Sequence, residues 1–97
     1  MTTETPAHIN PERVPTLARG YRLQHDKVRN LWLIQAPERA LVLEGAAPEI
    51  MKLVDGSRTA NTIIETLVAQ YDAPHDLIAQ DVYTLFADLT QKGALRA

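Results

Sequence analysis

The stretch Pro37-Glu38-Arg39-Ala40-Leu41-Val42-Leu43-Glu44 decides the fold of this 97-residue chain. After the proline, residues 39–43 are mostly apolar and predict a short strand that leaves a turn. Gly45 and Pro48 then lead into residues 49–54, whose pattern predicts a short helix. A strand at the rim of a small sheet exposes unpaired backbone N–H and C=O groups, on which an extended peptide can dock.

Two more strands are expected before this one. Residues 21–26 alternate Tyr, Leu and His with Arg, Gln and Asp, which is the period of a strand with one covered face. A polar turn at residues 27–30 precedes Leu-Trp-Leu-Ile at residues 31–34, a strand with two apolar faces. Three short strands with tight connections predict an antiparallel meander. Such a sheet is too small to bury both faces, so helices must cover it.

Spacing predicts three helices after the strands: residues 48–54, residues 59 or 61 to 71, and about 74 to 92. Thr59 is a candidate N-cap of the second helix, and Thr62-x-x-Glu65 is a competing capping box. Gly93 is suited to end the third helix. The apolar stripes expected to face inward are Ile63, Ile64, Leu67, Val68 and Tyr71 on the second helix, and Ile78, Val82, Leu85, Phe86 and Leu89 on the third.

The predicted fold class is α+β, with a three-stranded antiparallel sheet followed by three helices (β-β-β-α-α-α), similar in order to a winged helix-turn-helix. The length favours a single folded domain with a modest core. Residues 1–18 contain three prolines and no sustained periodicity, so we expect an extended N-terminal arm there and the folded domain at residues 19–97.

Composition narrows the classes of function. Ten Lys and Arg against twelve Asp and Glu give a net charge of −2, which provides no general attraction to nucleic acids or anionic membranes. No apolar run approaches the roughly 20 residues of a membrane span, and no secretory signal pattern is present, so we expect a cytoplasmic protein.

Catalytic and metal-binding patterns are also missing from the sequence. The chain has no cysteine, which excludes thiolate metal sites, disulfides and a cysteine nucleophile. His8, His25 and His75 are too widely spaced to match a metal-binding motif. We therefore expect a protein that is not an enzyme and that uses neither a metal nor a cofactor.

Several short stretches together carry a family resemblance over about residues 9–95. They are Pro37–Leu43, Ala47–Ile50 with Leu53–Gly56, Arg58-Thr59 with Ile63-Ile64, Tyr71–Pro74, and Asp81-Val82 leading to Gly93–Leu95. In these stretches the chain resembles the PqqD family of pyrroloquinoline quinone (PQQ) biosynthesis, stand-alone recognition domains for ribosomally synthesised precursor peptides. It departs from the family at Glu44-Gly45, where such sequences often have Asn and Thr.

The resemblance implies a non-catalytic peptide chaperone. Such a protein would bind the precursor peptide PqqA and present it to the radical S-adenosylmethionine enzyme PqqE. The peptide would add as a strand beside the third strand, in a cleft closed by the third helix. Backbone pairing would then provide affinity, and pockets for alternate side chains would provide specificity.

Candidate peptide-binding residues follow from the third strand and the third helix. On the strand, Arg39, Leu41 and Leu43 share one face and Ala40 and Val42 the other, and the sequence leaves open which face contacts the core. Plain core packing competes with peptide contact for these Leu and Val residues. Arg39 is expected to pair with an acidic residue of the peptide. The complete candidate set is Arg39, Leu41, Val42, Leu43, Ala79, Val82, Tyr83 and Phe86.

Other interpretations stay open at this point. An acidic winged-helix DNA-binding regulator is one, although the third helix presents Asp76, Asp81 and Asp88 where a DNA-reading helix normally carries basic or amide side chains. A scaffolding subunit without peptide affinity is another. Trp32 is either part of the core or an exposed contact for a partner. We expect a monomer in solution, with a strand-swapped or edge-paired homodimer as the alternative.

Overall fold

The computed structural model describes residues 9–97. The predicted α+β class is confirmed, because a three-stranded antiparallel sheet is followed by three helices. Two further strands of two residues each were not predicted. The elements are β1 Thr16–Leu17, β2 Arg22–Asp26, β3 Leu31–Ala36, β4 Arg39–Leu43, α1 Ala47–Met51, α2 Ala60–Tyr71, α3 His75–Gln91 and β5 Leu95–Arg96.

The sheet has the order β2-β3-β4, with β3 in the centre. Ile34 on β3 lies opposite Leu23 on one side and Leu41 on the other. Ile34 is fully buried and belongs to the core cluster, so this row of side chains faces the helices. The next row in that phase is His25, Trp32 and Leu43. The face of β4 that contacts the core is therefore the one that carries Leu41 and Leu43.

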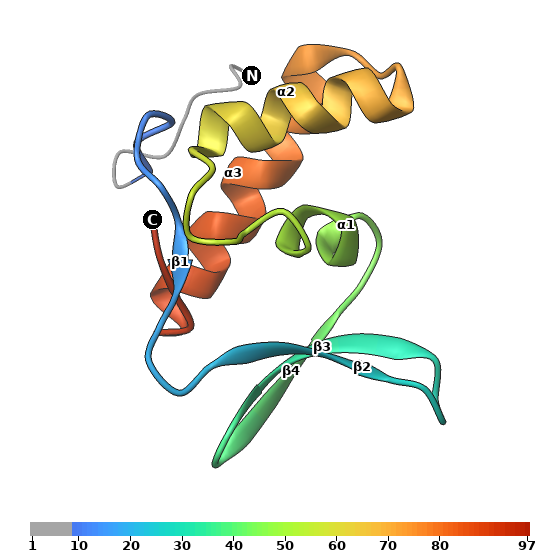
Figure 1. The fold of residues 1–97 in the computed structure, drawn as a ribbon, viewed down its shortest axis with the longest axis vertical. Helices are drawn as coiled ribbons and strands as arrows, with labels where there is room; N and C mark the ends of the chain where they lie inside the picture. Colours follow the sequence, from blue (N-terminus) through green and yellow to red (C-terminus); the bar gives the residue numbers. More distant parts are fainter. Residues whose placement is uncertain (1–8) are drawn as a thin grey trace.

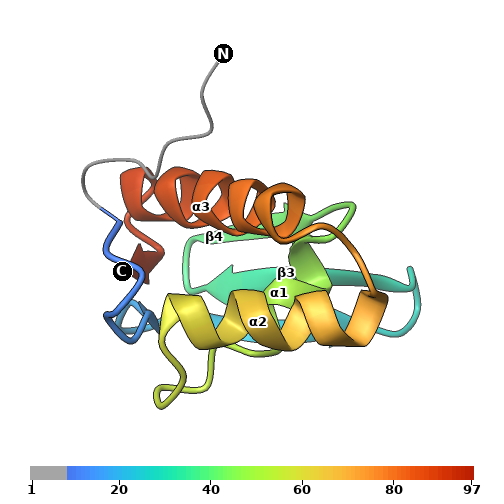
Figure 2. The same cartoon turned by 90° about the horizontal axis from the view of Figure 1, so that it is seen from above.

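All three helices lie on one side of the sheet. Figure 1 shows α1 between the sheet and α2, with α3 descending from the end of α2 toward the sheet, and Figure 2 shows α2 and α3 running in opposite directions on either side of α1. Their apolar stripes meet the sheet in one core. Its fully buried large side chains include Ile34, Met51, Ile63, Ile64, Val82 and Phe86.

The ends of the helices follow the sequence signals. Thr59 is the N-cap of α2, because its side-chain oxygen accepts a hydrogen bond from the Thr62 N–H at 3.1 Å. The competing capping box at Thr62 is therefore wrong. Beyond the end of α3, Gly93 has a φ of 79°, a left-handed conformation that favours glycine.

Residues 9–18 of the predicted arm pack against the domain. Ile9 and Pro15 are buried, and β1 pairs with β5 near the other end of the chain. The carbonyl groups of Pro11 and Arg13 accept hydrogen bonds from Asn61 N (2.8 Å) and Ala60 N (3.1 Å), two N–H groups in the first turn of α2. This segment therefore supplies partners that the helix terminus lacks. Residues 1–8 of the predicted arm lie outside the described residues.

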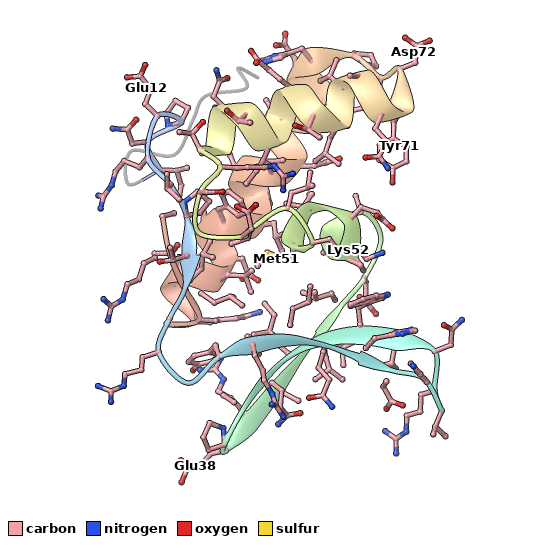
Figure 3. The ribbon with its side chains drawn as sticks, in the orientation of Figure 1. Glu12, Glu38, Met51, Lys52, Tyr71 and Asp72 are labelled. Atoms are coloured by element: carbon pink, nitrogen blue, oxygen red, sulfur yellow. The ribbon has the colours of Figure 1, made fainter. Side chains whose placement is uncertain are left out.

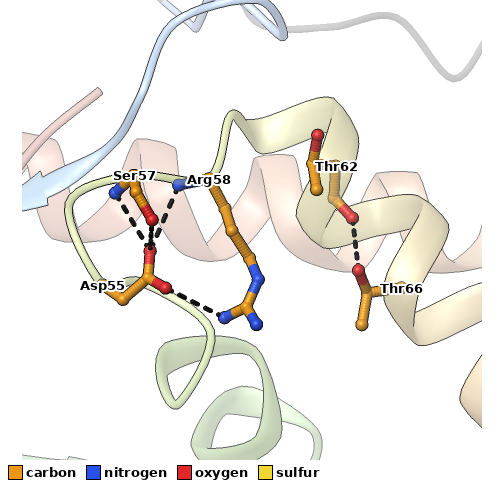
Figure 4. A network of polar contacts seen from close by, with 5 residues as sticks. All are labelled: Asp55, Ser57, Arg58, Thr62 and Thr66. Carbon is orange, nitrogen blue, oxygen red and sulfur yellow. Dashed lines mark hydrogen bonds and ion pairs between the residues drawn. The ribbon is translucent and has the colours of Figure 1, made fainter.

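The turn between α1 and α2 is built around the carboxylate of Asp55 (Figure 4). Its Oδ1 accepts hydrogen bonds from Ser57 N at 3.0 Å and Arg58 N at 3.1 Å, and its Oδ2 pairs with Arg58 Nη1 at 3.1 Å. These donors, led by the two backbone N–H groups, lower the pKa of Asp55 below its ordinary value of 3.8. The turn therefore places Thr59 at the N-terminus of α2.

Within residues 9–97, no helix combines the length and the apolar character that a membrane span requires.

The turn predicts a pH-dependent contribution of Asp55 to stability. Because its pKa is lowered on folding, the contribution is present above pH 3.8 and is lost as the pH falls through the folded-state pKa. We expect Asp55→Asn to be less stable than wild type near neutral pH, with a difference that shrinks below pH 3.8. Urea unfolding across this range measures it. Asp72→Asn removes an exposed carboxylate and serves as the control. A difference that is constant with pH would contradict the assignment.

Candidate peptide-binding site

β4 has one free edge. Only β3 pairs with it among the described strands. Pro37 and Glu38 form a two-residue turn, so the closing pair Ala36 and Arg39 is hydrogen-bonded. Pairs alternate along an antiparallel ladder, and the backbone N–H and C=O groups of Ala40 and Val42 therefore point away from β3. This edge offers donors and acceptors to an added strand.

Two hollows lie between α3 and residues 44–50, the segment that follows β4. The larger measures about 600 Å³ and the smaller about 300 Å³. They share Ala46, Ile50 and Asp81, and we call them together the groove. The larger hollow is lined by Glu44, Ala46, Ala47, Ile50, Gln80, Asp81, Thr84, Leu85 and Asp88. The smaller is lined by Gly45, Ala46, Glu49, Ile50, Leu67, Tyr71, Ile78 and Asp81.

The smaller hollow lies where the three helices approach one another. Ile50 comes from α1, Leu67 from α2 and Ile78 from α3, and their side chains make its lining largely apolar. Tyr71 projects from the end of α2 toward α1 (Figure 3) and is 49% exposed. Such a hollow suits one apolar side chain of a ligand.

α3 presents different faces to the core and to the groove. Val82 and Phe86 are completely buried in the core, and Ala79 is 9% exposed and belongs to the same cluster. Tyr83 is half-buried and lines neither hollow. The face that lines the larger hollow carries Gln80, Asp81, Thr84, Leu85 and Asp88. The four α3 residues predicted to contact the peptide therefore lie behind the groove, and none of them lines it.

The predicted β4 residues are divided between two faces. Leu41 is half-buried and Leu43 is buried on the helix side of the sheet, whereas Val42 is 55% exposed on the opposite face. An added strand would meet Leu41 with one set of alternate side chains and Val42 with the other.

Arg39 ties the β3–β4 hairpin to the end of α3. Its Nη1 donates a hydrogen bond to the carbonyl oxygen of Lys92 at 2.8 Å and lies 3.4 Å from the Tyr21 hydroxyl. The guanidinium also lies 6.0 Å from the centre of the Tyr21 ring. A cation at the C-terminus of a helix interacts favourably with the helix dipole. Arg39 thus has a structural role that the sequence did not predict.

Trp32 belongs to the helix side of the sheet and is half-buried. Its ring stacks on His25 with centroids 4.5 Å apart, and Lys52 Nζ lies 4.6 Å from its centre. Of the two interpretations left open by the sequence, the structure therefore favours partial burial against the core.

Most residues that line the larger hollow are not predicted by the sequence. Glu44, Gln80, Asp81, Thr84 and Asp88 are exposed and polar, so their pattern is that of an ordinary solvated surface. Leu85, which belonged to the predicted inward stripe, is half-buried and lines the larger hollow. Among residues 9–97, no group of three or more potential ligands is placed to hold a metal ion.

Comparison with known proteins gives the family. The model of the family described as coenzyme PQQ synthesis protein D (PqqD) matches residues 32–95, more than half of the chain. The chain belongs to the PqqD family. A "PqqA binding protein" of Gluconobacter oxydans is 48% identical over 93 residues, which cover 96% of this chain and 97% of that protein. The predicted family resemblance is confirmed.

In a second relative, the region that matches this chain is part of a longer protein. The bifunctional coenzyme PQQ synthesis protein C/D of Methylorubrum extorquens is 40% identical over 94 residues. The match covers 97% of this chain but only 25% of that protein. The chain therefore corresponds to about a quarter of the bifunctional relative.

Two solved PqqD structures resemble this one. The solution NMR structure of the PqqD truncation of Methylobacterium extorquens PqqCD has a TM-score of 0.78 at 39% identity and covers 92% of this chain and 95% of that chain. It is described as a functional and stand-alone recognition element for ribosomally synthesised and post-translationally modified peptides. The crystal structure of PqqD from Xanthomonas campestris has a TM-score of 0.58 at 38% identity, covering 92% and 99%. These relatives confirm the prediction of a non-catalytic protein.

The contact between Arg39 and α3 predicts a modest contribution to stability. We expect Arg39→Ala to lower the free energy of unfolding by about 0.5–1 kcal/mol, because the Lys92 carbonyl loses a charged donor at the helix terminus. Denaturant unfolding measures the change. Arg22→Ala removes an exposed arginine of β2 whose side chain makes no hydrogen bond or ion pair within residues 9–97, and we expect it to have little effect. Equal losses in the two variants would argue against the structural role.

Proposed function

We propose that this chain binds the precursor peptide PqqA by strand addition to β4, as a non-catalytic recognition element in PQQ synthesis. The observation that carries the proposal is the free edge of β4, which leads into the groove beside α3. Two kinds of support come from the comparisons: relatives are named PqqA binding proteins, and a solved relative is described as a peptide recognition element.

The geometry suggests how each part of the site would act. The N–H and C=O groups of Ala40 and Val42 would pair with the peptide backbone. One peptide side chain on the helix side would lie near Leu41, and a later one of the same set would reach the larger hollow, which Leu85 lines. A further apolar side chain would occupy the smaller hollow, beyond the end of β4.

The other candidate residues have indirect roles in this proposal. Val82 and Phe86 would hold α3 at its distance from the sheet, since both are completely buried in the core. Ala79 and Tyr83 do not line the groove either and would help Val82 and Phe86 to position α3. Arg39 has N–H groups besides the one that contacts Lys92, and these are available to an acidic residue of the peptide.

Presentation of the bound peptide to PqqE extends the same proposal. A peptide held along one edge of the domain keeps its remaining length outside the groove, where a second protein has access to it. We place this event in the cytoplasm, where a ribosomally made peptide is first available. The protein would act as a monomer, because edge pairing between two copies would occupy the backbone groups that the peptide needs.

The alternative functions are not favoured. Asp76, Asp81 and Asp88 are exposed on α3, the helix that a winged-helix regulator of this element order would insert into DNA, and carboxylates there repel phosphates. The likeness to winged helix-turn-helix domains thus remains one of element order. A scaffold without peptide affinity would not require the free edge of β4 or the groove beside it.

Proline at position 42 tests strand addition directly. The N–H of Val42 points away from β3, so Val42→Pro removes a donor from the free edge and leaves the ladder to β3 intact. We expect wild type to bind synthetic PqqA at micromolar concentration or tighter, which is about −8 kcal/mol at the micromolar limit. The folded Val42→Pro variant should lose about tenfold or more in calorimetric titration.

Two controls make this experiment specific. Val42→Thr keeps the N–H and a β-branched side chain, so it should retain the wild-type affinity. Leu41→Pro removes a donor to Ile34 inside the ladder and should destabilise the sheet itself. A folded Val42→Pro protein with unchanged affinity would exclude pairing at this edge.

A further inference from the structure

Among residues 9–97, the groove is lined by acidic side chains and by no basic ones. Its four carboxylates are those of Glu44, Glu49, Asp81 and Asp88, and no Lys, Arg or His of the described chain lines either hollow. Each hollow therefore has a negative wall beside its apolar surface, although the chain as a whole is close to neutral.

Two of these carboxylates are already paired with lysines from outside the groove. Lys52 Nζ lies 3.1 Å from Glu49 and Lys92 Nζ lies 2.9 Å from Asp88. The carboxylates of Glu44 and Asp81 make no hydrogen bond or ion pair with any part of the described chain, and both residues are exposed. The unpaired negative charge of the groove is thus concentrated in these two side chains.

Glu44 and Asp81 also lie on the expected path of the peptide. Glu44 directly follows β4, so a strand that pairs with Ala40 and Val42 reaches it next. Asp81 lines both hollows and therefore stands where one leads into the other. A peptide that runs along β4 and continues toward the smaller hollow must pass both carboxylates.

We propose that the bound peptide carries a Lys or Arg whose side chain pairs with Asp81 and Glu44, and that this pairing fixes the register of the added strand. The inference rests on the proposed function, since it assigns the chemistry of the segment that β4 receives. Backbone pairing alone permits a slip by two residues, which keeps every side chain on its face. A charged contact at one position removes that degeneracy.

The expected effect is moderate because both carboxylates are exposed. Ion pairs between exposed groups each contribute about 0.2–1 kcal/mol. Replacing one carboxylate should thus weaken binding of PqqA by up to about fivefold, and replacing both by about two- to thirtyfold. The affinity of wild type should also fall with salt more steeply than that of the double variant.

Calorimetric titration of PqqA into matched variants provides the test. The variants are Asp81→Asn, Glu44→Gln and the two combined. Glu65→Gln is the control, because it removes one exposed carboxylate of α2 that lies outside both hollows. We expect Glu65→Gln to have the same affinity as wild type at each salt concentration. The double variant should bind more weakly, and its affinity should depend less on salt.

A second measurement changes the peptide and leaves the protein intact. Each Lys and Arg of PqqA is replaced in turn by Gln and titrated into wild type and into Asp81→Asn. One replacement should weaken binding to wild type more than binding to Asp81→Asn, by about two- to fivefold, because Glu44 stays in the variant as the second partner. That position identifies the basic residue of the pair.

The outcomes separate this inference from the proposed function. If wild type and the double variant bind PqqA equally and no basic residue couples to Asp81, the charge pairing is wrong and strand addition stands. If Glu65→Gln weakens binding as much as Asp81→Asn, the effect is one of overall charge and the pairing is again wrong. If wild type does not bind PqqA, the proposed function fails together with the inference.

Discussion

Burial of one face of a small sheet by three helices is the constraint on which the rest of this structure depends. Ile34, at the centre of β3, is fully buried in the same cluster as Phe86 and Ile63 from the two long helices. The apolar face of such a sheet must be buried against another layer of secondary structure. The helices that cover the face do not pair with the strands, so the outer edge of β4 has no strand partner within residues 9–97.

α3 shows how one helix serves both packing and binding. Val82 and Phe86 on its inner stripe have no exposed surface, while Asp81 and Leu85 on a neighbouring stripe line the groove. The two stripes move as one body because they belong to the same helix. Core side chains thereby set the width of a groove that they do not line, and a change of volume at Val82 or Phe86 is transmitted to it.

The sequence was sufficient for most of the fold because its signals are local. Alternation marked β2, the helical stripes marked α2 and α3, and Thr59 and Gly93 marked helix ends that the structure confirms. β1 and β5 have two residues each, too few for any periodicity, and they form only through pairing with each other. No pattern within residues 9–18 indicates that backbone carbonyls there receive the first N–H groups of α2.

The candidate site was predicted in part. The third strand was identified from its apolar residues and its place after a turn, and its free edge follows from the topology. On α3, most of the predicted contact residues are apolar, and a stripe of apolar residues marks the face that packs in the core. Asp81, Thr84 and Asp88 line the groove, but their polarity is what any solvated helix face shows. Only the position of α1 across from them distinguishes that face.

The pairing of β1 with β5 has a consequence for how the molecule assembles. Leu17 lies opposite Leu95, so this ladder joins residues from nearly opposite ends of the described chain. Closing such a long loop is entropically costly unless the intervening sheet and helices have already brought its ends together. We therefore expect this ladder to form late in folding, so that amide protection at the two strands would report on whether the whole domain is folded.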